Sequence, residues 1–172
     1  FSRLGVRVTL VVKAQRVLGF LDMQIGEALQ YHMRSMGMTL RFGEELETVT
    51  REEADGKASV DVKLKSGKTL CADALLYCLG RQGVTHRLNL DAVSLSASAR
   101  GTLEVDDNYR TSNENIYAVG DVVGFPSLAS TAMNQGRIAA CHMFDRKIKD
   151  YRKLFPYGIY SIPEISMVGD NE

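Results

Sequence analysis

The chain has 172 residues, of which 45% are hydrophobic, and this is enough apolar material for a packed globular fold. Its 21 Lys and Arg residues balance its 21 Asp and Glu residues, which argues against nucleic acid or an acidic membrane surface as a partner. No apolar run approaches the roughly 20 residues that cross a bilayer, so we expect a cytoplasmic protein that binds small molecules.

The first forty residues have the pattern of a strand, a helix and a second strand. Residues 6–12 (VRVTLVV) are β-branched and apolar, which is typical of a strand buried on both faces of a parallel sheet. Asp22 can cap a helix over about 23–36 that Gly37 would end, and residues 38–42 supply the next strand. This order predicts a βαβ unit with a right-handed crossover in a doubly wound α/β sheet.

Three shorter strands are predicted next. They span residues 46–50, 59–64 and 69–72, with a charged loop at Asp55 and a tight turn at Gly67. Strands joined in this way form an antiparallel β-meander.

Two further apolar runs predict buried strands. Residues 74–80 (ALLYCLG) form the first run, which ends where Gly80 and Arg81 break the pattern. The chain is then polar and turn-rich until the second run, residues 116–119 (IYAV). Domain boundaries are placed to give three segments, residues 1–83, 84–153 and 154–172.

Gly120 and Asp121 stand at the carboxyl end of the second run, where ligands bind in open α/β sheets. Gly120 lets a ligand approach the backbone, and the Asp121 carboxylate can accept hydrogen bonds from vicinal hydroxyls such as those of ribitol. Ser127 can cap a following helix, whose free N–H groups would stabilise negative charge on a reduced flavin. On these residues alone, an ordinary turn and an ordinary cap are the alternative.

The end of the strand 6–12 bears on the choice of nucleotide, since an acidic residue there binds the ribose 2′-hydroxyl of NAD. This chain has Val12 there, followed by Lys13 and Arg16, so that a 2′-phosphate would meet two cations and no carboxylate. The arrangement is compatible with NADP and does not exclude NAD. A solvated basic loop is an equal alternative.

A longer pattern surrounds Gly120 and Asp121. Thr111 followed by residues 116–121 (IYAVGD) resembles the second FAD fingerprint of the flavoprotein disulfide-reductase family. Residues 6–42, Gly80 with Arg81, and residues 161–169 fall in the same family's order. The resemblance therefore covers essentially the whole chain.

The resemblance implies a partial Rossmann-like fold with two dinucleotide-binding domains, truncated at both ends. Residues 1–83 would be the later part of the NAD(P)-binding domain and residues 84–153 the return segment of the FAD-binding domain. Residues 154–172 would begin a dimerisation domain, so a homodimer or a higher homo-oligomer is expected.

The resemblance also implies roles for single residues. Asp121 would bind the flavin ribitol, and the backbone of Leu128, Ala129 and Ser130 would meet the pyrimidine edge of the ring. Gly80 would lie beside the nicotinamide dinucleotide. Arg81 is a further candidate for the cofactor site, with a solvated or ion-paired loop residue as the alternative.

The activity implied is hydride transfer through FAD between two nicotinamide dinucleotides, with NAD and NADP as substrates. Disulfide reduction by other members of the family is the alternative, and a non-catalytic interaction module is an alternative of another class. The chain contains no G-x-G-x-x-G loop, and no two of its three cysteines have redox-motif spacing. We expect those loops upstream of Phe1, and no catalytic residue within the chain.

Overall fold

The computed structural model describes residues 1–54, 56–148 and 156–169. The chain divides into two compact units. The first comprises Phe1–Cys78 together with the segment that starts at Gly158, and the second comprises Leu79–Tyr157. The predicted division at residues 83 and 153 stays a prediction, and position 153 lies outside the described residues.

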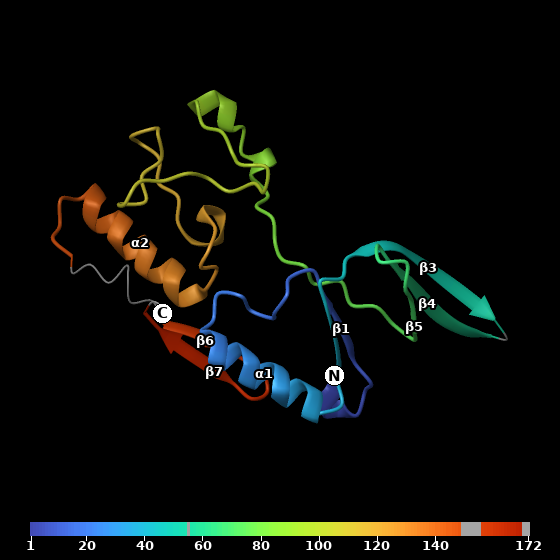
Figure 1. Ribbon diagram of the computed structural model, residues 1–172. Helices are drawn as coiled ribbons and strands as arrows, with labels where there is room; N and C mark the ends of the chain where they lie inside the picture. The colour runs from blue at the N-terminus through green and yellow to red at the C-terminus, as the bar shows by residue number, and fades with distance from the viewer. Residues whose placement is uncertain (55, 149–155, 170–172) are drawn as a thin grey trace. The chain divides into compact units, whose positions relative to one another are not determined.

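The first unit begins with the predicted βαβ element (Figure 1). Strand β1 (Thr9–Val12) pairs in parallel with β2 (Thr39–Phe42), and helix α1 (Met23–Ser35) connects them. Asp22 caps the helix by accepting a 2.8 Å hydrogen bond from the Gln24 N–H. Gly37 follows with φ +82°, a conformation that suits glycine at a helix end. The order strand, helix, strand is confirmed. The first strand, however, starts at Thr9 and not at Val6, and none of its residues is buried, so the prediction of a strand buried on both faces over residues 6–12 is wrong.

The core of the first unit forms where α1 meets both of the unit's two-stranded sheets. Leu29 of α1 packs with Val17 and Leu21 of the loop before it, and all three are buried. Ile165 joins this cluster from β7 (Ile165–Val168), which lies beside β6 (Pro156–Ile159).

The antiparallel meander is also confirmed. Its strands are β3 (Leu46–Ala54), β4 (Lys57–Leu64) and β5 (Thr69–Ala72), paired in the order β3-β4-β5. Leu64 at the end of β4 has no exposed surface, and the Gly67 N–H donates to its carbonyl at 2.9 Å to close the tight turn. The predicted loop at Asp55 lies outside the described residues.

The predicted strand at residues 74–80 is wrong. The segment has no regular structure, and every residue in it is exposed, including Leu76 at 67% and Tyr77 at 70%. A strand needs a neighbour whose N–H and C=O groups complete its ladder. No described strand lies along this segment, so its apolar composition alone does not make it one.

In its described residues, the second unit is mostly irregular, with one α-helix and several short 3₁₀ turns. The predicted strand at residues 116–119 is also wrong, because only Tyr117 forms a bridge, to Arg110. Helix α2 (Ala129–Met143) starts after Leu128, and the side chain of Ser127 does not cap it. Ser127 Oγ instead donates to the Gly124 carbonyl at 3.3 Å, so the predicted cap is corrected. Along the described ranges, the 3₁₀ helices are η1 (Ser2–Leu4), η2 (Thr85–Arg87), η3 (Leu90–Val93) and η4 (Gly120–Val123).

None of the helices in the described part of the chain has the length and apolar character needed to cross a bilayer. In the same part of the chain, no three His, Cys, Asp or Glu residues group closely enough to hold a metal ion.

Candidate functional site

A short 3₁₀ turn, η4, presents Asp121 at the surface of the second unit. Val119 is extended, and Gly120 then adopts φ +79°, a left-handed conformation that few other residues tolerate. A Cβ on Gly120 would come within 3.3 Å of the Ala132 Cβ, so the turn approaches helix α2 closely. The side chain of Asp121 remains 47% exposed, and its carboxylate is available to a ligand.

Gln135 of α2 fixes this turn to the helix. Its side-chain Oε1 accepts a 2.6 Å hydrogen bond from the Gly120 N–H, and both residues are buried. Because an unpaired buried N–H is costly, this bond holds the position of the residue that follows it, Asp121. Gln135 was not among the site residues predicted from the sequence. Its only signal was a polar residue on the helix face shared with buried Thr131 and Ile138.

The amino-terminal turn of α2 brings Leu128, Ala129 and Ser130 together. Leu128 is the extended residue before the helix, and its carbonyl accepts the Ala132 N–H at 2.9 Å. The first N–H groups of a helix have no acceptor within it, and they carry a partial positive charge. No acidic residue stands in this first turn, and Ala129 and Ser130 are exposed. The geometry suits an electron-rich group near the turn.

Arg81 forms an ion pair with Asp121, the residue expected to bind the ribitol. Its Nη1 lies 3.0 Å from Asp121 Oδ2, in an ion pair whose side chains are 81% and 47% exposed. Exposed pairs of this kind are weak, and a carboxylate has further lone pairs for hydroxyl groups. Gly80 just before it has φ +117° and lies in open space. Arg81 and Asp121 are thus neighbours although they are distant in sequence.

The segment leading to Asp121 is held by side-chain hydrogen bonds. Thr111 is buried, and its hydroxyl donates to the carbonyls of Ile116 at 2.9 Å and of Asn113 at 3.0 Å. The hydroxyl of Tyr117 lies 2.7 Å from Nδ1 of His142 at the far end of α2. These bonds replace the missing sheet ladder as supports for the turn.

The first unit holds the other candidate residues, which follow β1. Val12 packs against the core, and Lys13 Nζ lies 3.2 Å from Glu45 Oε2. The Arg16 Nη2 donates at 2.7 Å to the Gly19 carbonyl within its own loop. From the sequence, no carboxylate was expected near Lys13. Glu45 corrects that expectation, because the turn after β2 brings it back beside the end of β1.

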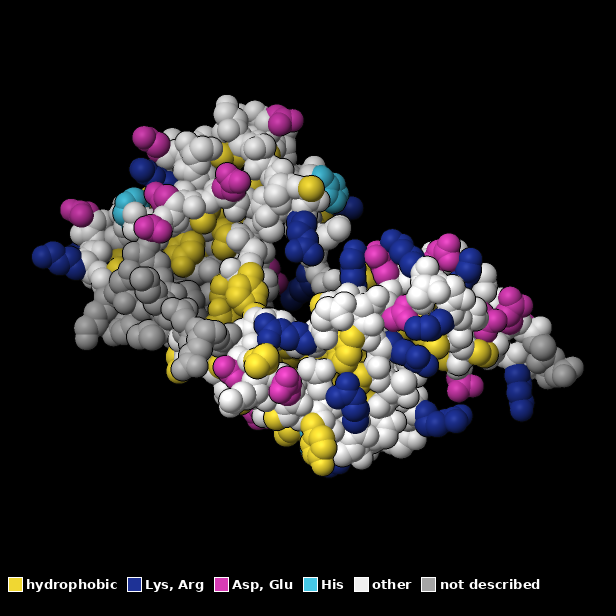
Figure 2. Space-filling view, in the orientation of Figure 1, with side chains coloured by type: hydrophobic (Ala, Val, Ile, Leu, Met, Phe, Trp, Pro, Cys, Tyr) yellow, Lys and Arg dark blue, Asp and Glu magenta, His cyan; other side chains and the backbone are white. Residues whose placement is uncertain are grey.

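Glu45 also pairs with a second lysine, Lys65, which belongs to the meander. Lys65 Nζ lies 3.1 Å from Glu45 Oε1, and the bonds from Lys65 and Lys13 lower the pKa of the Glu45 carboxyl. Figure 2 shows basic and acidic side chains intermingled over the meander, where Lys63 pairs with Glu47 at 3.0 Å.

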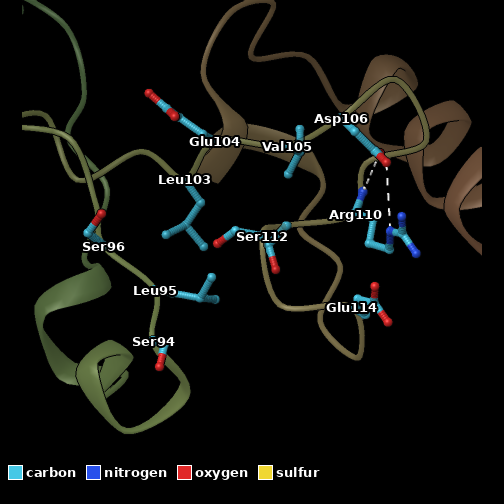
Figure 3. A pocket seen from close by; sticks show the side chains of 11 residues that line it. Ser94, Leu95, Ser96, Leu103, Glu104, Val105, Asp106, Arg110, Ser112 and Glu114 are labelled. Carbon is cyan, nitrogen blue, oxygen red and sulfur yellow. Dashed lines mark hydrogen bonds and ion pairs between the residues drawn. The ribbon is translucent and has the colours of Figure 1, made fainter.

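A hollow of about 490 Å³ lies elsewhere in the second unit (Figure 3). Leu95 and Leu103 line it, and Asp106 and Arg110 stand at one side with 3.7 Å between Oδ2 and Nε. Asp106 Oδ1 accepts hydrogen bonds from the backbone N–H groups of Asn108 and Arg110, so its carboxylate stabilises a local turn. Thr111 of the fingerprint also lines this hollow, whereas none of the candidate cofactor-binding residues does.

Similar proteins share both the sequence and the fold. The chain is 50% identical over its full 172 residues to a soluble pyridine nucleotide transhydrogenase of Pseudomonas savastanoi pv. phaseolicola, and 48% identical to one of Chromohalobacter salexigens. In both cases it spans 36% of the relative's length.

Solved structures superpose on nearly all of the chain. LpdA of Mycobacterium tuberculosis matches 98% of it with a TM-score of 0.87 and 31% identity, over 36% of its own length. The HOCl-induced flavoprotein disulfide reductase RclA of Escherichia coli matches 99% with a TM-score of 0.85 and 26% identity, over 39% of its length. Residues 1–136 match the family described as pyridine nucleotide-disulphide oxidoreductase. The chain belongs to the pyridine nucleotide-disulphide oxidoreductase family.

Proposed function

We propose that the chain is part of an FAD-dependent enzyme that moves hydride between NADPH and NAD⁺. One observation carries the proposal. The exposed Asp121 stands on a glycine turn that Gln135 fixes against the helix whose amino-terminal turn is free of acidic groups. The identity of 50% to a relative named soluble pyridine nucleotide transhydrogenase supports it.

The residues of the second unit fit the flavin in chemical character. The Asp121 carboxylate would accept hydrogen bonds from the ribitol hydroxyls, and the small surface of Gly120 would let the ribitol approach the backbone. The N–H groups at Leu128, Ala129 and Ser130 would stabilise negative charge on the pyrimidine side. The flavin, when bound, supplies the site that takes up and releases hydride.

Arg81 and Gly80 would act at the edge of the same site. Arg81 is 81% exposed and can rotate between Asp121 and a phosphate or carbonyl group of a ligand. Gly80 leaves open space for a nicotinamide dinucleotide beside the backbone. In the first unit, Val12, Lys13 and Arg16 would meet the adenosine ribose of the nicotinamide substrate.

The rest of the proposal concerns the complete protein. We propose NAD and NADP as its substrates, a homodimer as its assembly and the cytoplasm as its location. In β6, β7 and the loop between them, Tyr160 and Ile162 are 86% and 57% exposed, and a second subunit would cover such side chains.

Disulfide reduction is the second candidate. The structural match to the flavoprotein disulfide reductase RclA favours it, because the same fold performs that chemistry there. Disulfide reduction needs a dithiol centre, whereas hydride transfer between nucleotides does not. The three cysteines of this chain are all unpaired, with Cys71 and Cys78 exposed and Cys141 half-buried.

Purification of the complete gene product tests the proposal. We expect flavin absorbance near one FAD per chain and rapid reduction of an NAD⁺ analogue by NADPH without any disulfide. An Asp121→Ala variant should lose flavin, whereas Asp107→Ala should retain it. Turnover that requires lipoamide or glutathione would favour the second candidate. A flavin-free product without hydride transfer would overturn both.

A further inference from the structure

The carboxylate of Glu45 lies between two lysines from different parts of the first unit. Its Oε2 is 3.2 Å from Lys13 Nζ at the end of β1, and its Oε1 is 3.1 Å from Lys65 Nζ in the turn between β4 and β5. Each oxygen therefore has its own cation. The side chain of Lys13 is 76% exposed, that of Glu45 39% and that of Lys65 59%, so all three can move.

We propose that Glu45 is a specificity-determining residue that sets how well the site accepts a nucleotide with a 2′-phosphate. The inference rests on the proposed function, because it takes the end of β1 as the ribose site. A 2′-phosphate that binds Lys13 must compete with the Glu45 carboxylate for the same ammonium group and is repelled by it. A 2′-hydroxyl is neutral and meets no such opposition.

Lys65 gives the Glu45 carboxylate a second counter-charge when Lys13 binds a phosphate. When a 2′-phosphate takes Lys13, the Glu45 carboxylate keeps its bond to Lys65 and is not left without a counter-charge. The site therefore tolerates both nucleotides, with Lys13 shared between Glu45 and the ligand. Arg16 donates from Nη2 to the Gly19 carbonyl and keeps further N–H donors for the same phosphate.

The two residues should act in opposite directions. Removing the Glu45 charge frees Lys13 and takes away the repulsion, so affinity for a 2′-phosphate should rise. Removing Lys65 leaves Glu45 with Lys13 as its only partner among these three groups, so the same affinity should fall. If the cluster served only to join the meander to β1, both changes would weaken the fold and neither would separate the two kinds of nucleotide.

Isothermal titration of adenosine 2′-phosphate and adenosine 5′-phosphate into the complete gene product tests this proposal. The readout is the ratio of the two dissociation constants, which needs neither flavin nor turnover. We expect Glu45→Gln to bind the 2′-phosphate about two- to fivefold more tightly, as suits the loss of one exposed charge pair, and Lys65→Met to bind it about twofold more weakly. Binding of the 5′-phosphate should stay unchanged in both variants.

Two further variants complete the design. Glu47→Gln removes the same charge from the neighbouring pair with Lys63 and should leave the ratio unchanged. Glu45→Asp keeps the charge and should stay close to the parent ratio even where Glu45→Gln folds poorly. The proposal is overturned if Glu45→Gln and Glu47→Gln give the same ratio, if Glu45→Gln and Lys65→Met shift it in one direction, or if neither nucleotide binds. A flavin-free protein that still shows the opposite shifts would refute the hydride-transfer function and leave the role of Glu45 standing.

Discussion

Truncation of Gln135 tests how the Asp121 turn is held. In Gln135→Ala the buried Gly120 N–H loses its 2.6 Å acceptor, and the side chain that filled the space is only 3% exposed. An unsatisfied buried donor costs about 1–3 kcal/mol, and the lost buried methylene adds about 0.8 kcal/mol. The expected loss in the free energy of unfolding is therefore about 2–4 kcal/mol, which lowers Tm by roughly 4–16 °C in a chain of this size.

Hydrogen exchange of the Gly120 amide measures the effect at its origin. We expect this amide to exchange about thirty- to several hundredfold faster in Gln135→Ala than in the parent chain, in step with the lowered Tm. Asn134→Ala is the matched control, since Asn134 lies next to Gln135 on α2 and accepts only an exposed bond from Arg137. If both variants shift Tm equally and leave Gly120 protected, the argument for Gln135 as the support of the turn is wrong.

Three more predictions concern single side chains. Asp121→Asn should weaken flavin binding by the complete gene product about ten- to a hundredfold, measured by fluorescence titration, because charged hydrogen bonds contribute about 1.5–3 kcal/mol; unchanged affinity would remove Asp121 from the site. Leu64→Ala should lower the free energy of unfolding by about 2–5 kcal/mol in urea denaturation, because Leu64 is fully buried, whereas Val49→Ala at a 46% exposed position should cost far less. The 2.6 Å bond from Lys68 lowers the pKa of Glu44 below its ordinary 4.5, so its contribution to stability is present above about pH 4.5 and is lost as pH falls through the lowered pKa. Glu44→Gln should flatten urea midpoints plotted against pH in that acid range, and an unaltered curve would contradict the assignment.

The elements that sequence could predict are those whose signals are local. Asp22 and Gly37 mark the two ends of α1 with side-chain chemistry that acts within one turn. The meander follows from alternating residues and a glycine turn. The runs at 74–80 and 116–119 have equally apolar sequences, but a strand also depends on a neighbour distant in sequence, and the described residues provide no ladder for either.

The same distinction applies to the candidate site. Asp121 could be predicted, because its glycine turn and the helix after it are contiguous in sequence. Arg81 was also predicted as a site residue, but its pairing with Asp121 was not. Neither Gln135 nor Glu45 was predicted, since each meets its counterpart only after the chain has folded back. No periodicity or spacing encodes such a meeting. The Ser127 cap was wrong for a related reason, because its hydroxyl has a competing acceptor in the Gly124 carbonyl.

The bond between Gly120 and Gln135 also limits how this motif can be transplanted. A protein engineer who copied only residues 116–121 into a new scaffold would move Asp121 without Gln135. The side-chain amide of Gln135 holds the Gly120 turn against the helix. The smallest portable piece runs from Tyr109 to His142, since the bridge between Arg110 and Tyr117 and the side-chain bonds of Thr111, Gln135 and Tyr117 all close within that stretch. Grafts shorter than this should present the carboxylate in many orientations.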